Sequence, residues 1–436
     1  MRRGLNGEVA PRPEPPGGPV HVSHLATEVD RDPRYSAIAR LRAETRFYDA
    51  VIDQVDGRRI RVGEHWLTDW ASCNYLGFDL EPDIIGAVDE QLRRWGTHPS
   101  WSRMLGNPAL YPQIEQRLAA LLGAEDTLVL PTITQIHLSV IPVLAQQGTI
   151  LVDSRAHKTI WDGCVFARAQ GATLSRFRSL DELAALLAAG NPGPVLVCMD
   201  GVNSMTGNIP DVRACLDLCR AHGAVLYIDD AHGFGVIGAR ADDETSPYGI
   251  SGNSIIRYCG ESYDNVVLVG GFSKAYSSLL AFLAVPTVLK NRLKSAAAPY
   301  LYSGPSPTAS LATVLAGFDV NAERGDKLRS ELYRMTTRVL QHVRGLGVFT
   351  PNTDDTPIIE LPIALDRDLV EVSERLWERG LFVTLAPYPG VPRDQVGFRV
   401  QVTAANTDAE IDHLNAVISE LAADGVFQEA RESSAS

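Results

Sequence analysis

The sequence of 436 residues predicts an α/β protein, with a mostly parallel sheet in a large domain and a smaller α+β domain. Two observations support this prediction. Between about residues 125 and 290, short continuous apolar runs alternate with helix-like stretches, as in a parallel sheet covered on both faces. After Ser306 the pattern becomes helical and then mixes strand-like runs with a final helix. Ligands of such folds bind at the carboxyl ends of the parallel strands.

The elements of the large domain follow from this alternation. Ile209–Ala221 is a predicted helix, because Pro210 and Asp211 open it and Gly223 follows its end. The apolar runs typical of buried strands include Thr127–Leu130, Ile150–Val152, Val195–Met199, Val225–Ile228, Val266–Val269 and Phe282–Val285.

The C-terminal third gives the smaller domain. We expect helices at Ala309–Phe318, Leu328–Leu346 and Asp408–Ala422, and strands at Pro357–Leu361, Leu381–Thr384 and Phe398–Val402. The predicted organisation is a disordered arm (1–30), an N-terminal bridge or part of the small domain (31–95), the large domain (96–325), the small domain (326–426) and a frayed tail (427–436).

Composition excludes several classes of protein. There are 40 Lys+Arg against 53 Asp+Glu, so the net charge of −13 argues against a nucleic-acid surface. No apolar run approaches the roughly 20 residues that a membrane helix needs, and no apolar segment follows Arg2 and Arg3 to form a signal peptide. Six scattered cysteines without zinc-site spacing indicate reduced thiols. We therefore expect a cytoplasmic protein without a metal site.

The segment Val225–Gly238 carries the first chemical signal. An apolar strand ends in Asp229 and Asp230, and His232 and several glycines follow. A carboxylate at a strand end can hold a protonated ring nitrogen, and a histidine three residues later can reach a neighbouring substituent of the ring. Taken alone, the same residues are more often a helix cap or a salt bridge.

The segment Val266–Tyr276 carries the second signal, because a strand leads directly into Ser273 and Lys274. A lysine shielded from water there can form a Schiff base with a carbonyl, although a lone lysine after a strand is more often a surface residue. A Schiff-base lysine and an aspartate for a pyridinium nitrogen are together what pyridoxal 5'-phosphate (PLP) chemistry requires.

These motifs, Asp229–Gly238 and Ser273–Ala275, resemble those of the α-oxoamine synthase family of PLP enzymes, over about residues 70–425. The resemblance implies the aspartate aminotransferase-like fold, a homodimer with shared active sites, and condensation of an α-amino acid with an acyl thioester of CoA or a carrier protein, usually with decarboxylation. The product would be an α-aminoketone in a biosynthetic pathway.

The resemblance also implies roles for individual residues. Asp229 would pair with the pyridine nitrogen and His232 with the ring hydroxyl. Lys274 would form the Schiff base and remove the α-proton, and the imidazole of His157 would stack on the ring. The other implied cofactor contacts are Ser204, the helix-opening Thr132, Ile133 and Thr134, Ser273, and Ser303, which would reach the neighbouring subunit's phosphate. The implied substrate contacts are Arg399 for the carboxylate, Asn74 and Ser102.

The chain departs from the family pattern around the acyl side of the site, which predicts a divergent member. Thr97–Trp101 replaces a glycine-rich stretch, His137 replaces an asparagine, and Gly271 replaces a threonine. Ser277–Ala281 stands where the family has glycines after the lysine.

Three alternatives remain open from the sequence. Another PLP reaction, transamination or an aldol-type C–C reaction, would use the same residues. A non-catalytic partner subunit would be expected to lose Lys274, which is present. Finally, Lys290, Arg292 and Lys294 form either a solvated helix face or a contact for a CoA phosphate or an acidic carrier protein.

Overall fold

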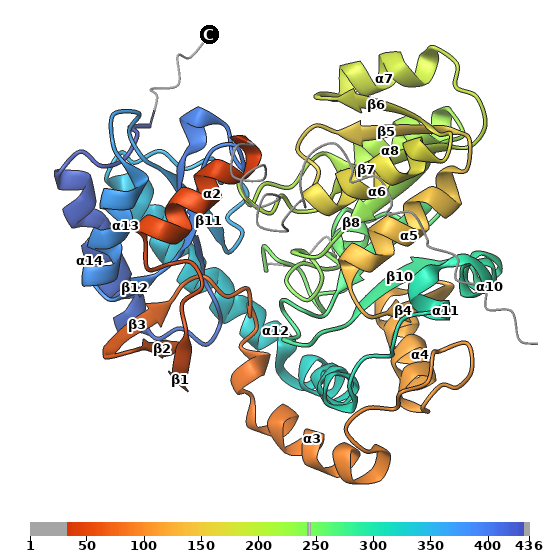
Figure 1. The fold of residues 1–436 in the computed structure, drawn as a ribbon, viewed down its shortest axis with the longest axis horizontal. Coiled ribbons are helices and arrows are strands. Elements are labelled where there is room, and N and C mark those ends of the chain that lie inside the picture. The colour runs from red at the N-terminus through yellow and green to blue at the C-terminus, as the bar shows by residue number, and fades with distance from the viewer. Residues whose placement is uncertain (1–32, 242–243, 245, 431–436) are drawn as a thin grey trace, which may run out of the picture.

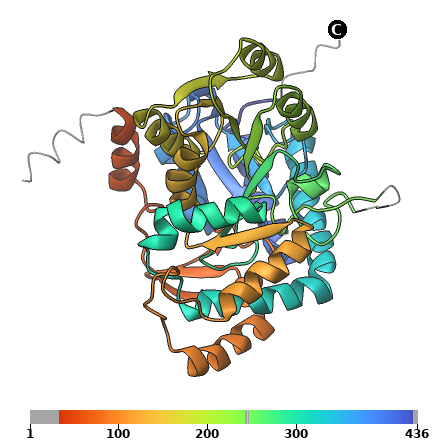
Figure 2. The same cartoon turned by 90° about the vertical axis from the view of Figure 1, so that its right-hand side faces the viewer.

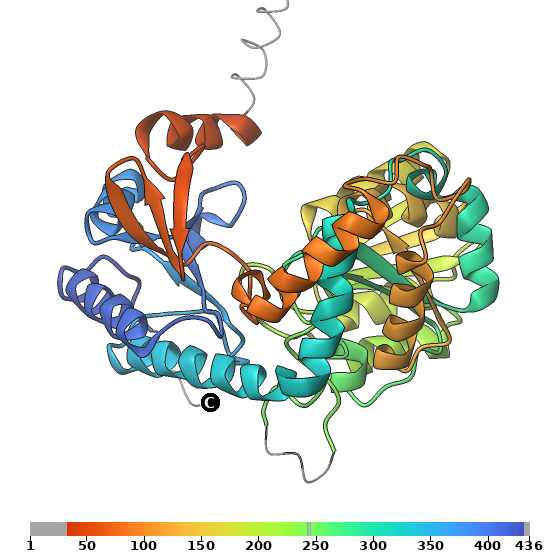
Figure 3. The same ribbon diagram turned by 90° about the horizontal axis from the view of Figure 1, so that it is seen from below.

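The computed structural model describes residues 33–430 except 242, 243 and 245, so the predicted arm at 1–30 lies outside the described residues. Two bodies lie side by side and are joined by the long helix α12 (Thr308–Gly345), which runs from one to the other (Figure 1, Figure 3). The division into domains at the residue numbers given above stays a prediction.

The larger body is built on a seven-stranded sheet with the order β4-β10-β9-β8-β7-β5-β6. Only β10 runs antiparallel to its neighbours, so the sheet is mostly parallel, as predicted. The strands are β4 (Asp126–Leu130), β5 (Thr149–Asp153), β6 (Thr173–Phe177), β7 (Val195–Asp200), β8 (Val225–Asp229), β9 (Val266–Gly271) and β10 (Ala281–Val285). The sequence did not indicate β6, because this edge strand is only partly buried and carries no continuous apolar run.

Helices cover both faces of this sheet. One face carries α5 (Ile133–Ala145) and α6 (Lys158–Ala169), which form an apolar cluster with β-strand residues such as Leu128, Tyr227 and Val269. The outer side of the body shows α4 and α10 against β4 (Figure 2). The remaining helices of this part are α3 (Pro82–Trp95), α4 (Leu110–Leu122), α7 (Leu180–Ala188), α8 (Val212–Ala221), α9 (Ile255–Tyr258), α10 (Thr287–Ala296) and α11 (Ala298–Leu301), with the short η1 (Phe78–Leu80) before α3.

Helix α12 is continuous over 38 residues, although the sequence pattern predicted two segments separated by a polar stretch at 319–327. The polar side chains of this stretch pair with other elements. Arg324 binds Glu81 and Asp83 at the start of α3. Asn321 donates to the carbonyl oxygen of Ser251 at 3.0 Å. The stretch is therefore helical because its polar groups have tertiary partners, which periodicity does not reveal.

The smaller body contains two further sheets. An antiparallel sheet has the order β11-β14-β13, and a second sheet has the order β1-β2-β3-β12, in which the N-terminal strands pair with a C-terminal one. The predicted strand at Leu381–Thr384 divides between the two sheets as β12 (Leu381–Phe382) and β13 (Thr384–Ala386). The other elements are α2 (Pro33–Glu44), β1 (Ile52–Asp56), β2 (Arg59–Val62), β3 (His65–Asp69), β11 (Ile358–Pro362), α13 (Leu369–Glu378), η2 (Arg393–Gln395), β14 (Gly397–Gln401) and α14 (Asp408–Ala423).

The chain after α14 is not frayed where it is described. Phe427 is buried and forms a bridge with Ile363, and Glu429 forms one with Val348. The frayed tail predicted from residue 427 is therefore wrong for residues 427–429, because Phe427 supplies an apolar anchor. Within the described ranges, no helix has the length and apolarity needed to span a membrane.

A tight contact at Gly207 gives a test of how the two bodies meet. The residue has φ +75°, and an added Cβ would lie 2.3 Å from Thr356 Oγ1 and 2.6 Å from the carbonyl oxygen of Ile358. We expect Gly207→Ala to lower the free energy of unfolding by about 3 kcal/mol, from backbone strain and overpacking together. Gly223→Ala is the matched control, because Gly223 has φ +65° and open space around it, and it should cost about 1 kcal/mol. Urea denaturation of both variants measures the difference, and equal losses would contradict this account.

Candidate active site

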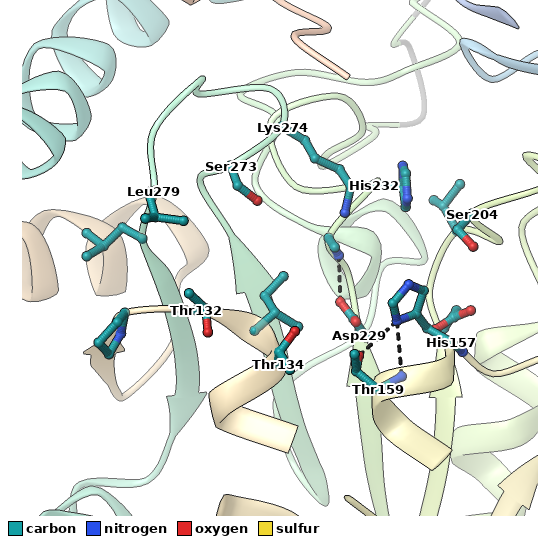
Figure 4. A pocket seen from close by; sticks show the side chains of 16 residues that line it. Thr132, Thr134, His157, Thr159, Ser204, Asp229, His232, Ser273, Lys274 and Leu279 are labelled. Carbon is teal, nitrogen blue, oxygen red and sulfur yellow. Dashed lines mark hydrogen bonds between the residues drawn. The ribbon is translucent and has the colours of Figure 1, made fainter. Parts of the chain in front are cut away.

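The carboxyl ends of four strands meet at a cavity of about 310 Å³ (Figure 4). Asp200 ends β7 and lies opposite Asp229, which ends β8, in the parallel register. Strand β9 leads into Ser273 and Lys274, and β4 leads through Pro131 into α5. Nine residues predicted from the sequence line this cavity: Thr132, Ile133, Thr134, His157, Ser204, Asp229, His232, Ser273 and Lys274.

Asp229 is a buried carboxylate with two protein donors. Its Oδ2 lies 3.0 Å from His137 Nε2, and its Oδ1 accepts a hydrogen bond of 2.9 Å from the backbone N–H of Ala231. Burial raises the pKa of Asp229, but the hydrogen bond from His137 and the charge of Lys274 outweigh it and leave the pKa below its ordinary value. The carboxylate is therefore ionised.

Asp200 has the opposite electrostatic environment. Its Oδ1 accepts a hydrogen bond of 3.2 Å from the backbone N–H of His157, and its Oδ2 is buried without a partner in the described part of the chain. Burial, together with the charge of Asp229, raises the pKa of Asp200 well above its ordinary value. Two adjacent acids are thus held in different protonation states, with the charge on Asp229.

His232 is buried and held by a tyrosine that the sequence analysis did not single out. The hydroxyl of Tyr75 lies 2.8 Å from His232 Nδ1. Burial lowers the pKa of His232 and raises that of Tyr75, so the imidazole is neutral and the phenol keeps its proton. Tyr75 therefore donates to Nδ1, and His232 presents an Nε2–H toward the cavity. The only sequence signal for Tyr75 is its place next to Asn74.

His157 and Lys274 reach the cavity from two loops (Figure 4). His157 is the N-cap of α6, and its Nδ1 lies 2.8 Å from Thr159 Oγ1, which fixes the orientation of the ring. The side chain of Lys274 is directed into the space above Asp229 (Figure 4). Together with burial, the positive charge of Lys274 lowers the pKa of His232. The same charge lowers the pKa of Asp229 and so opposes the increase that burial causes there.

The N-terminus of α5 supplies donors at the other end of the cavity. Thr132 is the N-cap, and its side chain accepts from the backbone N–H of Gln135. Free backbone N–H groups at such a terminus favour an anion. The departure at Gly271 has a local explanation, because an added Cβ there would lie 2.6 Å from Ile133 Cδ1. The isoleucine fills the space that a side chain at position 271 would take.

Arg399 lies on β14 in the smaller body and connects it to the cavity. Its Nη1 donates to the backbone oxygen of Ser204, which lines the cavity. The buried Gln401 on the same face of the strand accepts from Arg399, at 2.7 Å for Nη2, with its amide oxygen turned toward the guanidinium. Nη1 also lies 3.6 Å from Met205 Sδ. Three partners thus fix the guanidinium, and one N–H of Nη2 stays available for a carboxylate.

Four predicted residues do not line the cavity. Arg399 is one of them and reaches it only through the backbone oxygen of Ser204. The other three lie elsewhere. Asn74 donates to Asp79 at 3.0 Å. Ser102 closes a turn through its backbone oxygen, and the neighbouring Arg103 is buried in an ion pair with Glu115. Ser303 lines a separate cavity of about 630 Å³. The assignments of Asn74, Ser102 and Ser303 therefore gain no support from this single chain.

The predicted basic surface at Lys290, Arg292 and Lys294 is only partly correct. Lys290 is buried and pairs with Glu115 at 2.9 Å and Asp126 at 2.8 Å. It cannot meet a CoA phosphate or a carrier protein, because its charge is already neutralised inside the protein.

Residues 67–418 match the sequence profile of the family described as aminotransferase class I and II. The chain belongs to this family. The 8-amino-7-oxononanoate synthase of Chromohalobacter salexigens is 33% identical over 352 residues, which cover 79% of this chain and 87% of that protein. This similarity confirms the resemblance predicted from the sequence motifs.

Solved structures show the same fold. The serine palmitoyltransferase of Sphingomonas wittichii superposes with a TM-score of 0.81 at 26% identity, covering 93% of this chain and 98% of that one. The serine palmitoyltransferase of S. paucimobilis, solved with a bound PLP–myriocin aldimine, gives a TM-score of 0.80 at 23% identity, with 92% and 97% covered. The predicted fold class is confirmed.

A buried carboxyl beside Arg399 adds a feature that the sequence analysis did not mention. Glu360 on β11 lies opposite Arg399 in the antiparallel register and is completely buried. Neither of its carboxyl oxygens has a hydrogen-bond partner among the described residues. Burial raises the pKa of Glu360 to about 7, against the opposing charge of Arg399.

This carboxyl predicts a pH-dependent stability. Between pH 4.5 and 7 the folded protein keeps a proton on Glu360 that the unfolded chain has lost, so stability falls as pH rises and levels off above about pH 7. The free energy of unfolding of Glu360→Gln, taken relative to that of wild type, should therefore rise by up to about 3 kcal/mol from pH 5 to pH 8. Urea denaturation at the two pH values measures the gain, with the exposed Glu371→Gln as control. A constant difference between variant and wild type would show that Glu360 does not titrate in this range.

Proposed function

We propose that the protein is a PLP-dependent C-acyltransferase of the α-oxoamine synthase type. The observation that carries the proposal is one cavity lined by Lys274, the ionised Asp229, His232 and His157. The similarity to an 8-amino-7-oxononanoate synthase, at 33% identity over most of both chains, supports the reaction type.

The residues of the cavity fit PLP. Its volume of about 310 Å³ lies within the range of small-molecule sites. The N-terminus of α5, with Thr132 and Thr134, suits the phosphate group. Asp229 carries the negative charge that a protonated pyridine nitrogen requires, and the Nε2–H of His232 suits the ring oxygen. When bound, PLP supplies an electron sink for a carbanion at the α-carbon of the amino acid.

Each residue then has a defined task. Asp229 would keep a proton on the ring nitrogen, and His157 would contact the ring. Lys274 would hold the cofactor through its amine, and as a free amine it would accept the proton from the α-carbon. Arg399, held by Ser204 and Gln401, binds the carboxylate of the amino acid.

In the overall reaction the C–H bond at the α-carbon of an amino acid breaks, with its proton passing to Lys274. The α-carbon then forms a bond to the acyl carbon of a thioester. The C–S bond of the thioester breaks and releases the thiol of CoA or of a carrier protein. The C–C bond to the amino-acid carboxylate breaks and releases CO2, and a proton replaces it on the α-carbon. The product is an α-aminoketone.

We also propose that the enzyme acts as a cytoplasmic homodimer in which Ser303 reaches the neighbouring subunit's phosphate. The exposed apolar side chains of Leu138, Phe166 and Tyr302 surround the cavity that Ser303 lines, and a second copy would cover them. Sedimentation of the wild type and of Tyr302→Asp tests this assembly, and a wild-type monomer would refute it.

The reaction type is tested with purified protein and PLP. Each of the twenty amino acids is added while the visible absorption of the cofactor is recorded. Any amino acid that changes the spectrum is then combined with acyl-CoA and acyl-carrier thioesters, and free thiol and CO2 are measured. Thiol and CO2 in equal amounts would support the proposal. A keto acid formed without thioester would indicate an aminotransferase instead, and no spectral change with any amino acid would exclude both.

Replacing the anchoring lysine gives the sharpest test of the site. We expect Lys274→Ala to lower kcat by at least about 1,000-fold, because the proton acceptor at the α-carbon is lost. The lysine-dependent visible absorption of the bound cofactor should disappear as well. Lys327→Ala, at an exposed position of α12, is the control and should keep both properties. Full activity of Lys274→Ala would contradict the assignment.

Arg399→Lys tests recognition of the carboxylate. A lysine keeps the charge but loses the planar pair of donors, which should raise KM for the amino acid about 10- to 100-fold. We expect a smaller change in KM for the thioester, and steady-state kinetics with each substrate varied in turn separates the two. If only KM for the thioester changed, Arg399 would instead belong to the binding site of the acyl donor.

A further inference from the structure

Behind Asp229 lies a buried chain of three polar side chains. His137 on α5 is completely buried and uses both ring nitrogens, with Nε2 at 3.0 Å from Asp229 Oδ2 and Nδ1 at 2.8 Å from the hydroxyl of Tyr227. His137 and Tyr227 do not line the cavity, so neither can touch a ligand there. Their polar atoms are directed only at each other and at Asp229.

The fold explains why these side chains meet. Tyr227 and Asp229 are two residues apart on β8, so they point to the same face of the sheet, the one that α5 covers. Gly163 on α6 lets that helix approach closely, because an added Cβ would lie 2.4 Å from the backbone oxygen of His137. The histidine is therefore held in a tight layer between β8 and α6.

The donors and acceptors allow one assignment of protons. An ionised carboxylate only accepts, so the proton of His137 that faces Asp229 is on Nε2. Burial raises the pKa of Tyr227 well above its ordinary value, so the phenol keeps its proton and donates it to Nδ1. The two hydrogen bonds, one at each ring nitrogen, together fix the orientation of the His137 ring.

We propose that His137 and Tyr227 are positioning residues of the active site, which fix the orientation and the charge of Asp229 from behind the cofactor. The inference rests on the proposed function, because Asp229 is there the partner of the ring nitrogen. Without the hydrogen bond from His137, burial would raise the pKa of Asp229, as it raises the pKa of Asp200. Other charged or titratable groups around Asp229 are Asp200, Asp230, His157, His232 and Lys274.

The test compares three variants of the buried chain. His137→Leu removes both ring nitrogens, His137→Gln keeps an amide that can donate to Asp229, and Tyr227→Phe removes only the hydroxyl. The readouts are the dissociation constant of PLP, the pH dependence of its visible absorption, and kcat and KM. Val140→Ala, which loosens the buried face of α5 without touching Asp229, is the control.

We expect His137→Leu to weaken PLP binding and lower kcat, each about 10- to 100-fold, with little change in KM for the amino acid, because a hydrogen bond to a buried charge is lost. The absorption of bound PLP should titrate at a different pH. His137→Gln should recover most of the loss, and Tyr227→Phe should lie between wild type and His137→Leu. Val140→Ala should lower thermal stability and leave the spectrum unchanged.

Two failures can be told apart. If wild type shows no lysine-dependent absorption with PLP, the proposed function fails and this inference with it. If wild type shows that absorption and His137→Leu keeps the same PLP affinity and pH dependence, the proposed function stands and the positioning role is wrong. Should His137→Leu not fold, His137→Ala takes its place, and wild-type affinity and titration of PLP in that variant would overturn the role of the histidine. The same result for Tyr227→Phe would overturn the role of the tyrosine.

Discussion

The site depends on keeping one carboxylate, that of Asp229, both buried and charged. A buried carboxylate loses its hydration, and only protein donors or a nearby cation can replace it. Asp229 has all of these, from His137, Ala231 and Lys274. Its neighbour Asp230 accepts one bond from the backbone of Ile255, and burial raises the pKa of that carboxyl well above its ordinary value. Adjacent residues of one motif are therefore chemically different because of their surroundings.

The parallel register of the large sheet determines which residues meet. Strands β7, β8 and β9 are neighbours, so the residues that follow them share one edge although they are far apart in the chain. A charged group at any of these strand ends changes the pKa values of the others, as the causes of the Asp200 and His232 shifts show. The cavity is a consequence of the topology and not of one local motif.

How much of the fold and of the site the sequence predicts depends on whether the interactions are local or join residues far apart in the chain. The six apolar runs and the residues at strand ends were predicted, because burial and strand termination leave local patterns. The polar middle of α12 was missed, because its helical state depends on Asn321 and Arg324 meeting partners far along the chain. His137 and Tyr75 were not recognised as partners of Asp229 and His232 for the same reason, since each pair joins different elements. Ser303 was predicted to contact the phosphate of the neighbouring subunit, and the structure of a single chain cannot contain that contact.

The continuity of α12 has a mechanical meaning for the active site. At about 1.5 Å per residue its 38 residues extend for about 57 Å, and one body is attached near each end. The length of the helix therefore determines the position of Arg399 relative to Lys274. Removing a single residue from its middle would turn everything beyond by about 100° and shift it by about 1.5 Å. The length of this helix, rather than its side chains alone, is thus part of what defines the distance between the substrate carboxylate and the reacting carbon.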